Sequence, residues 1–260
     1  MKSLERRKNI IDILNKHEQI KVKEIAEILA EKENNIRRDI RILRDMGLLS
    51  KVYGGIKTLG EENIIEKYFY GEIDNSPEKE LIAKKAAEYI QENDSIFLSS
   101  GTTVFKLAEI LYQYDYKLNI ITISLPVAAL LAKKNNFNLI FIGGTLIREN
   151  FSFEGSSVEQ LLKFFNIDKA FVGVRGFSFD HGFTIPAMEQ VTTLRALARF
   201  SGEINVLVDY TKFLKKCLII LSTFDDEVIR NKIKRVITNK TATQKDIERL
   251  RKEGTEVVLV

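Results

Sequence analysis

Arginine and asparagine side chains recur near the amino end of the chain at a spacing that suits contact with DNA. Apolar residues at positions 36, 40 and 43 predict a buried stripe, and hence a helix over about residues 33–46. Four polar side chains would then lie on the outward face of this helix: Asn34, Arg37, Arg38 and Arg41. Arginine binds phosphate or guanine in a bidentate manner and asparagine binds adenine likewise, so this face has the chemistry to enter the major groove.

The segments around this helix predict a winged helix-turn-helix. The spacing of apolar residues indicates two preceding helices, over about residues 4–16 and 22–29. Two short strands around a glycine-rich turn at Gly54 would follow and form a wing, from which Lys51 and Lys57 could contact phosphates. A three-helix bundle whose arginines face only water is the alternative interpretation.

Positive charge is concentrated in this first part of the 260-residue chain. Residues 1–60 contain 14 Lys and Arg against 9 Asp and Glu, whereas the rest of the chain contains 26 against 27. A basic unit on the same chain as a neutral one is typical of a nucleic-acid-binding protein.

Hydroxyl residues and glycine follow the first predicted strand of the remaining chain. This strand, residues 95–98, ends in Ser99-Ser100-Gly101-Thr102-Thr103 and turns directly into a helix. Glycine lets the backbone approach a ligand closely, and the free N–H groups of a helix start bind anions. The loop therefore suits a phosphate group, with a glycine turn and a threonine N-cap as the structural alternative.

Small or polar residues also follow the later predicted strands and should meet at the same edge of the sheet: Ser124, Gly143, Gly144, Arg175, Gly176, Asp209 and Lys212. Lys212 would supply charge and Asp209 would bind ligand hydroxyl groups, which suits an anionic, hydroxyl-rich ligand such as a sugar phosphate. A local ion pair between these two side chains, or a helix cap, is the alternative.

Short apolar runs alternate with amphipathic segments from residue 77 onward, which predicts an α/β fold with a mostly parallel sheet covered on both faces. Strands are expected at residues 95–98, 119–123, 138–142, 170–174, 204–208, 218–221, 235–237 and 256–260, and helices at 77–93, 103–112, 126–133, 157–165, 188–200 and 244–252. Leu81 is expected on the buried side of the first of these helices.

Composition sets the expected organisation and compartment. We expect a winged helix-turn-helix DNA-binding domain at residues 1–60, a linker at 61–76 and an effector-sensing α/β domain at 77–260. The longest uncharged stretch, residues 118–132, is shorter than the roughly 20 residues of a membrane-spanning helix. A single cysteine, Cys217, suits a reducing cytoplasm. Because the chain has only this cysteine and two histidines, we expect no metal site. We also expect no cofactor and no membrane partner.

Together these motifs resemble the DeoR-type transcriptional repressors, which respond to sugar phosphates. The resemblance rests on residues 19–26, Ile36-Arg37-Arg38-Asp39-Ile40, Tyr53-Gly54-Gly55, Gly101-Thr102-Thr103, residues 168–173 and the Asp-x-x-Lys run ending at Lys212. It implies an effector domain of the ribose-phosphate-isomerase or CoA-transferase type. Asp39 is expected to have a structural role, because phosphates repel a carboxylate.

Two sets of contacts follow from the motifs and the resemblance. Expected DNA contacts are Lys23, Asn34, Asn35, Arg37, Arg38, Arg41, Lys51, Tyr53 and Gly54. Expected effector contacts are Ser99, Ser100, Gly101, Thr102, Thr103, Ser124, Gly143, Gly144, Arg175, Gly176, Asp209 and Lys212.

The chain departs from the family pattern at three places. The serine and threonine that usually open the recognition helix are replaced by Lys32 and Asn35, and lysine has no acceptor for the first N–H groups, so Asn34 or Asn35 is expected to cap a shortened helix. The usual aspartate before the phosphate loop is Ser99, and the usual Thr-Asn-Ser contains Ile123 instead of asparagine.

The expected function is repression of a carbohydrate-use operon by a dimer or tetramer that leaves its double-stranded DNA operator when a phosphorylated sugar binds. We expect that the protein is not an enzyme. An isomerase-like enzyme acting on sugar phosphates, or a repressor without a small-molecule effector, are the alternatives.

Overall fold

The computed structural model divides into two compact units, Met1–Asn75 and Ser76–Val260, each of which is described by itself. The structure describes residues 3–14, 16–17, 19–45, 49–52, 55–58, 77–178, 182–213, 215–223, 226–239 and 244–260. The linker expected at residues 61–76 lies outside the described residues. Within the described parts, no helix is both long and apolar enough to cross a membrane.

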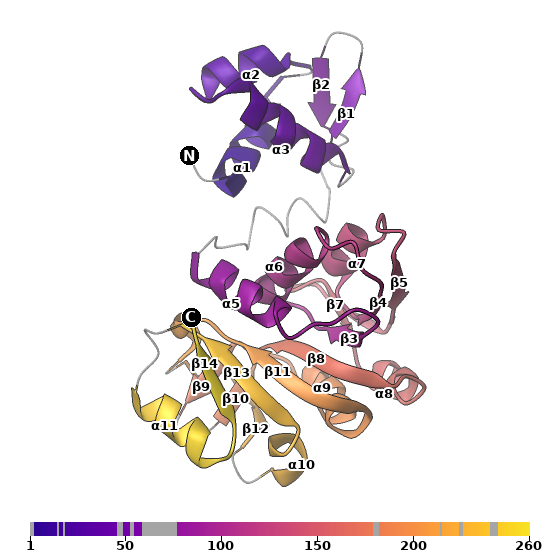
Figure 1. Ribbon diagram of the computed structural model, residues 1–260, viewed down its shortest axis with the longest axis vertical. Helices are drawn as coiled ribbons and strands as arrows, with labels where there is room; N and C mark the ends of the chain where they lie inside the picture. The colour runs from indigo at the N-terminus through magenta and orange to yellow at the C-terminus, as the bar shows by residue number, and fades with distance from the viewer. Residues whose placement is uncertain are drawn as a thin grey trace. The chain divides into compact units, whose positions relative to one another are not determined.

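The first unit is the predicted winged helix-turn-helix. Its elements are α1 (Ser3–Leu14), α2 (Val22–Ile28), α3 (Glu33–Asp45), β1 (Leu49–Val52) and β2 (Gly55–Thr58), with the two strands antiparallel (Figure 1). Ile36, Ile40 and Leu43 are buried, as their spacing along α3 predicts.

The wing is tied to the helices through the chain before α2. Ile20 exchanges two backbone hydrogen bonds with Ile56 of β2, with N···O distances of 3.2 and 3.0 Å. A Cβ atom on Gly55 would lie 2.6 Å from the carbonyl oxygen of Ile20, so only glycine allows this close approach. Glycine at the turn therefore fixes the wing to the body of the unit.

The second unit is built on a seven-stranded sheet in which every pair of neighbouring strands is parallel. In spatial order the strands are β14 (Glu256–Leu259), β13 (Ile233–Thr238), β11 (Ser201–Leu207), β8 (Ile167–Gly173), β3 (Ser95–Leu98), β4 (Leu118–Thr122) and β5 (Phe137–Phe141). Their apolar side chains form a continuous core, which explains why they read as short apolar runs in the sequence.

Helices cover both faces of this sheet, as Figure 1 shows. One layer contains α5 (Pro77–Ala87), α6 (Thr102–Leu111) and α7 (Leu125–Leu131), and the other contains α8 (Ser156–Leu162), α9 (Glu189–Phe200), α10 (Glu227–Arg230) and α11 (Gln244–Lys252). Successive strands run outward from β3 in one direction and from β8 in the other. Because crossovers between parallel strands are right-handed, the two directions place their helices on opposite faces. The predicted fold class is confirmed.

Short antiparallel pieces were not predicted. A hairpin of β6 (Thr145–Ile147) and β7 (Ser152–Glu154) follows β5, and β9 (Gly176–Ser178), β10 (Gly182–Ile185) and β12 (Ile219–Ser222) form a separate three-stranded sheet. The apolar run at residues 218–221 was expected among the strands of the parallel sheet, but β12 pairs antiparallel with β10. A four-residue apolar run does not show which strand it pairs with.

The helix expected over residues 77–93 is shorter, and one of its expected core residues is exposed. α5 ends at Ala87, after which Tyr89 and Ile90 donate backbone hydrogen bonds back to residues three positions earlier. Leu81 is 48% exposed, whereas Ile82 and Ala86 are buried. The alanines let the helix pack closely through a narrow face, and that face excludes Leu81.

Candidate DNA interface and effector site

The outward face of α3 presents several of the predicted DNA-binding side chains. Asn34, Arg37, Arg38 and Arg41 are exposed. The Arg37 Nη2 atom lies 2.5 Å from the Glu33 Oε1 atom one turn earlier, so the Arg37 guanidinium is held by an exposed ion pair. Such a pair contributes little to stability, but it orients the guanidinium along the helix surface.

The expected asparagine cap of a shortened α3 is wrong. The helix begins at Glu33, before both asparagines. The side-chain amide of Asn35 instead donates to the Glu31 Oε2 atom at 3.2 Å, and this hydrogen bond lowers the pKa of the Glu31 carboxyl below its usual value. Asn35 is thus engaged within the unit, while Asn34 faces solvent.

Four further expected DNA contacts belong to segments other than α3. The Lys23 side chain is 79% exposed on α2, with its Nζ atom 3.9 Å from the Glu27 Oε1 atom. Lys51 occupies β1 opposite Ile56 of β2. Tyr53 and Gly54, expected at the tip of the wing, lie outside the described residues.

Asp39 is buried beneath the recognition face. Its Oδ2 atom accepts a hydrogen bond of 2.6 Å from the Arg6 Nε atom of α1, and both side chains are almost fully buried. Arg6 also lies 3.5 Å from Glu31. This buried pair joins α1 to α3, so Asp39 has the structural role that was expected of it.

In the second unit, the strand order reverses between β3 and β8, and their carboxyl ends are held closely together. Ser99 donates its backbone N–H to the carbonyl oxygen of Phe171 at 3.0 Å, and its Oγ atom accepts from the N–H of Gly173 at 3.1 Å. A Cβ atom on Gly173 would lie 3.2 Å from the carbonyl oxygen of Ser100. Ligands of open parallel sheets bind at such a reversal, outside the carboxyl ends of the strands.

The helix that follows β3 starts at this reversal. Gly101 is the N-cap residue of α6 with φ of 112°, a conformation that glycine adopts readily. Thr102 and Thr103 begin the helix, its first turn contains no acidic residue, and no side chain caps it. The uncapped N–H groups and the helix dipole together favour an anion.

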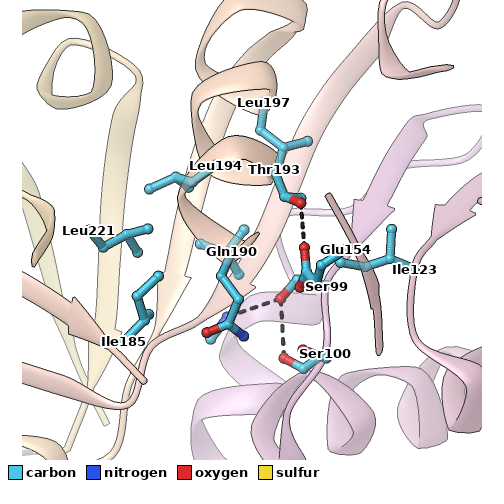
Figure 2. Close-up of a pocket in the computed structure, with 12 residues that line it drawn as sticks. Ser99, Ser100, Ile123, Glu154, Ile185, Gln190, Thr193, Leu194, Leu197 and Leu221 are labelled. Atoms are coloured by element: carbon cyan, nitrogen blue, oxygen red, sulfur yellow. Dashed lines mark hydrogen bonds between the residues drawn. The ribbon is translucent and has the colours of Figure 1, made fainter. Parts of the chain in front are cut away.

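A small cavity of about 40 Å³ lies beside these loops (Figure 2). Its lining residues are Ser99, Ser100, Ile123, Glu154, Val172, Gly173, Ile185, Gln190, Thr193, Leu194, Leu197 and Leu221. Of the predicted effector-binding residues, the cavity thus brings together Ser99 and Ser100.

A chain of buried polar side chains runs along the cavity. The Thr193 hydroxyl of α9 donates to the Glu154 Oε2 atom, and the Glu154 Oε1 atom lies 3.2 Å from the Ser152 Oγ atom. The Ser152 hydroxyl is 2.9 Å from the Asn150 Oδ1 atom, and the Asn150 amide donates to the Ser100 Oγ atom at 3.0 Å. Ser152 has one hydroxyl proton, so when it donates to Asn150 it can only accept from Glu154.

Burial raises the pKa of Glu154 to about 7, and the nearby Glu189 carboxylate adds to this rise, while the hydrogen bonds with Thr193 and Ser152 oppose it. A neutral Glu154 is therefore well populated at neutral pH.

The other predicted effector-binding residues occupy the same edge of the sheet but do not line the cavity. Ser124 is fully buried and caps α7 by accepting from the Val127 N–H. Gly143 and Gly144 follow β5, and Arg175 lies exposed after β8. Gly176 lies where a Cβ atom would approach the carbonyl oxygen of Lys215 to 2.5 Å, so its role there is packing.

The Asp-x-x-Lys run forms a local cap and ion pair. Asp209 is buried and caps the 3₁₀ helix η2 (Tyr210–Lys212) by accepting from the Thr211 N–H at 3.0 Å. The Lys212 Nζ atom lies 3.9 Å from the Asp209 Oδ2 atom. This is the structural alternative considered for these two residues.

Glu154, Gln190 and Thr193 were not predicted as cavity residues. Glu154 lies in a three-residue strand, too short to show an alternating pattern, and an isolated glutamate normally indicates a solvated surface. Gln190 and Thr193 lie on one face of α9, three residues apart, and this spacing was the available signal.

A winged helix-turn-helix on the same chain as a doubly covered parallel sheet defines a two-domain DNA-binding regulator. The sequence matches the DeoR-like helix-turn-helix domain over residues 6–62 and the DeoR C terminal sensor domain over residues 74–243. The chain belongs to the DeoR family of transcriptional regulators and is a regulator rather than an enzyme.

The similar proteins carry regulator names. The Lactose phosphotransferase system repressor of Lactococcus lactis subsp. lactis is 34% identical over 82% of this chain and 84% of its own length. The HTH-type transcriptional regulator IolR of Bacillus subtilis (strain 168) is 30% identical over 80% and 82%. Among solved structures, the probable sor operon regulator from Shigella flexneri aligns with a TM-score of 0.39 and 13% identity, over 68% of this chain and 90% of that chain. A structural similarity this weak says nothing about the activity of this chain.

Proposed function

We propose that this protein represses a carbohydrate-use operon and is released from its DNA operator by a phosphorylated sugar. The first unit would place α3 in the major groove and the wing on the backbone. The match to a sensor domain supports a bound effector, and the naming of a similar protein as a lactose phosphotransferase system repressor supports a carbohydrate.

One observation carries the choice of a phosphorylated ligand. The start of α6 offers backbone N–H groups without an acidic residue or a side-chain cap, directly at the reversal between β3 and β8. A phosphate there would be stabilised by hydrogen bonds from the backbone and by the helix dipole. Thr102 and Thr103 would add hydroxyl groups, and the adjoining cavity would receive another part of the ligand.

A dimer or tetramer is the proposed binding form. A single recognition helix contacts only a half-site, and two copies are needed for the contacts that give operator specificity. The proposed ligand would bind one arrangement of the copies more tightly than the other and thereby weaken DNA binding.

The function is tested by fluorescence anisotropy of operator DNA at fixed salt, titrated with a panel of hexose, pentose and triol phosphates. At least one phosphate is expected to release the DNA, while its unphosphorylated sugar has no effect. Retention of the DNA throughout the panel contradicts the proposal.

A matched pair of variants then tests the start of α6. Thr102→Glu places an anion among the N–H groups and should abolish release by the phosphate while leaving DNA binding intact. Gln113→Glu adds the same charge just beyond the other end of α6 and should be released like the parent. Equal release of both variants would show that the phosphate binds elsewhere.

A further inference from the structure

Glu154 is a buried carboxyl group without a cationic partner. It is 2% exposed, and it is the one acidic or basic residue among those that line the cavity. Within the described part of the chain, its contacts are hydrogen bonds with Thr193 and Ser152, and no Lys, Arg or His forms an ion pair with it. A buried carboxyl group of this kind either stays neutral or acquires a positive partner.

The elements packed around Glu154 do not supply that partner. From α9 the charged group acting on it is the Glu189 carboxylate, which is also negative. The Glu159 side chain of α8 pairs with Arg199 of α9 at 3.1 Å on the exposed surface. The loop after β3 and the end of β8 present only Ser99, Ser100, Val172 and Gly173 to the cavity.

The cavity is small and largely apolar, and its few polar groups include the Glu154 carboxyl and the Gln190 amide. Its volume of about 40 Å³ is enough for a small polar group, since a cavity of about 10–15 Å³ can hold a water molecule. The Gln190 Oε1 atom is buried and has no hydrogen-bond partner. In Figure 2, Gln190 and Thr193 of α9 lie on the cavity wall with Glu154. A carboxylate and an unpaired amide oxygen together match a group that only donates hydrogen bonds.

We propose that the cavity receives the ammonium group of an aminated sugar phosphate, with Glu154 as its counter-ion and Gln190 as a further acceptor. The inference rests on the proposed function, because it places the phosphate of the same ligand at the start of α6. An ammonium group offers three donors and no acceptor, which is the complement of these oxygen atoms. A neutral sugar hydroxyl in the same place would leave the carboxyl group without a charge partner.

Protonation of Glu154 distinguishes the two ligand types. Below pH 7 the free pocket holds a neutral Glu154, and binding of an ammonium group would favour its ionisation, releasing a proton to solvent. The affinity for the aminated ligand would therefore increase as the pH rises towards 7, by up to about tenfold per pH unit. The affinity for the hydroxyl analogue would not depend on Glu154 ionisation in this way.

Calorimetric titration at pH 6 tests the inference with three matched pairs: the 6-phosphates of glucose, galactose and mannose, each against its 2-amino-2-deoxy counterpart. At least one aminated ligand should bind tenfold or more tightly than its hydroxyl partner. Repeating the titration in buffers of different ionisation enthalpy should show more proton release for that ligand than for its hydroxyl partner, because the phosphate, with a second pKa of about 6, can release a proton from both.

The variants Glu154→Gln and Glu159→Gln complete the experiment. Glu154→Gln should bind both members of a pair within about threefold and release equal numbers of protons with the two. Glu159→Gln, changed on the surface of α8, should behave like the parent. Hydrogen exchange of the second unit shows whether each variant is folded. In the parent, the infrared band of the protonated Glu154 carboxyl group should disappear when the aminated ligand binds.

The outcomes separate this inference from the proposed function. If hydroxylated phosphates bind and release DNA while aminated ones gain nothing, the inference is wrong and the proposed function stands. An excess of proton release by the aminated ligand over its hydroxyl partner that persists in Glu154→Gln also overturns the inference. If none of the six phosphates binds, the inference fails, and the wider panel decides the proposed function.

Discussion

Asp39 and Arg38 are neighbours on α3, yet their side chains have opposite environments. Asp39 is 1% exposed and paired with Arg6, while Arg38 faces solvent. The helical period explains the difference, because consecutive residues lie about 100° apart around the axis. The two residues should therefore respond differently to truncation.

Arg38→Ala should weaken DNA binding by about 1–3 kcal/mol and reduce its salt dependence, because a cationic contact is lost. In this variant the free energy of unfolding of the first unit should change by less than about 0.5 kcal/mol. Asp39→Ala should destabilise the first unit by about 3 kcal/mol, since the buried Arg6 guanidinium would lose the carboxylate that accepts from its Nε atom. Fluorescence anisotropy measures the DNA binding of each variant, and hydrogen exchange of α1 and α3 measures its stability. Equal loss of stability in both variants would contradict the assignment of Arg38 to DNA binding and Asp39 to folding.

Glu154 should make the second unit less stable as the pH rises. Its pKa is raised from the usual 4.5 to about 7 in the folded protein, so the stabilisation is fully present below pH 4.5 and is lost as the pH rises through 7. The shift corresponds to about 3 kcal/mol, at 1.36 kcal/mol per unit. The free energies of unfolding of the parent and Glu154→Gln should be measured in urea from pH 4 to 8. The parent should lose stability relative to Glu154→Gln as the pH rises from 4.5 to 7. A constant difference would mean that Glu154 has an ordinary pKa.

At the scale of elements, predictability follows the length and period of the apolar pattern. The sequence pattern predicts β3 and α11 with their observed ends, because α11 has a clear helical period and β3 is an apolar run with polar residues on both sides. β6, β7 and β9 have three residues each, too few for any period, and the cavity depends on β7. The edge of the sheet that holds the candidate site was thus predictable, whereas Glu154 at its centre was not.

Glycine at the wing gives a prediction for an element as a whole. In Gly55→Ala the new Cβ atom would meet the backbone of Ile20 at 2.6 Å, so the strand must shift away from the helices. The first unit should lose about 1–3 kcal/mol of stability and bind DNA more weakly. Gly143→Ala, which meets no atom within 4 Å, is the matched control and should leave thermal unfolding unchanged. If hydrogen exchange in β1 and β2 of Gly55→Ala were as slow as in the parent, the close approach of Gly55 to Ile20 would not be needed to hold the wing.

At the scale of the whole molecule, the proposed function requires a coupling free energy between the DNA-binding unit and the sensor unit. The family assignment covers both, with the helix-turn-helix match over residues 6–62 and the sensor match over residues 74–243. Motifs in both parts made this organisation predictable from the sequence. The strength of coupling depends on the energies of alternative arrangements, which residue types alone do not encode.

Thermodynamic linkage makes that coupling measurable in two independent ways. If a sugar phosphate raises the Kd for operator DNA by some factor, the operator must raise the Kd for the sugar phosphate by the same factor, typically 5–150-fold for coupled sites. Anisotropy gives the first factor and calorimetry the second. In Arg38→Ala, at concentrations where the variant no longer binds the operator, added DNA should leave the Kd for the sugar phosphate unchanged. An unchanged Kd for the sugar phosphate when the parent is saturated with operator DNA would mean that the two sites are not coupled, and the two-site switch would have to be abandoned.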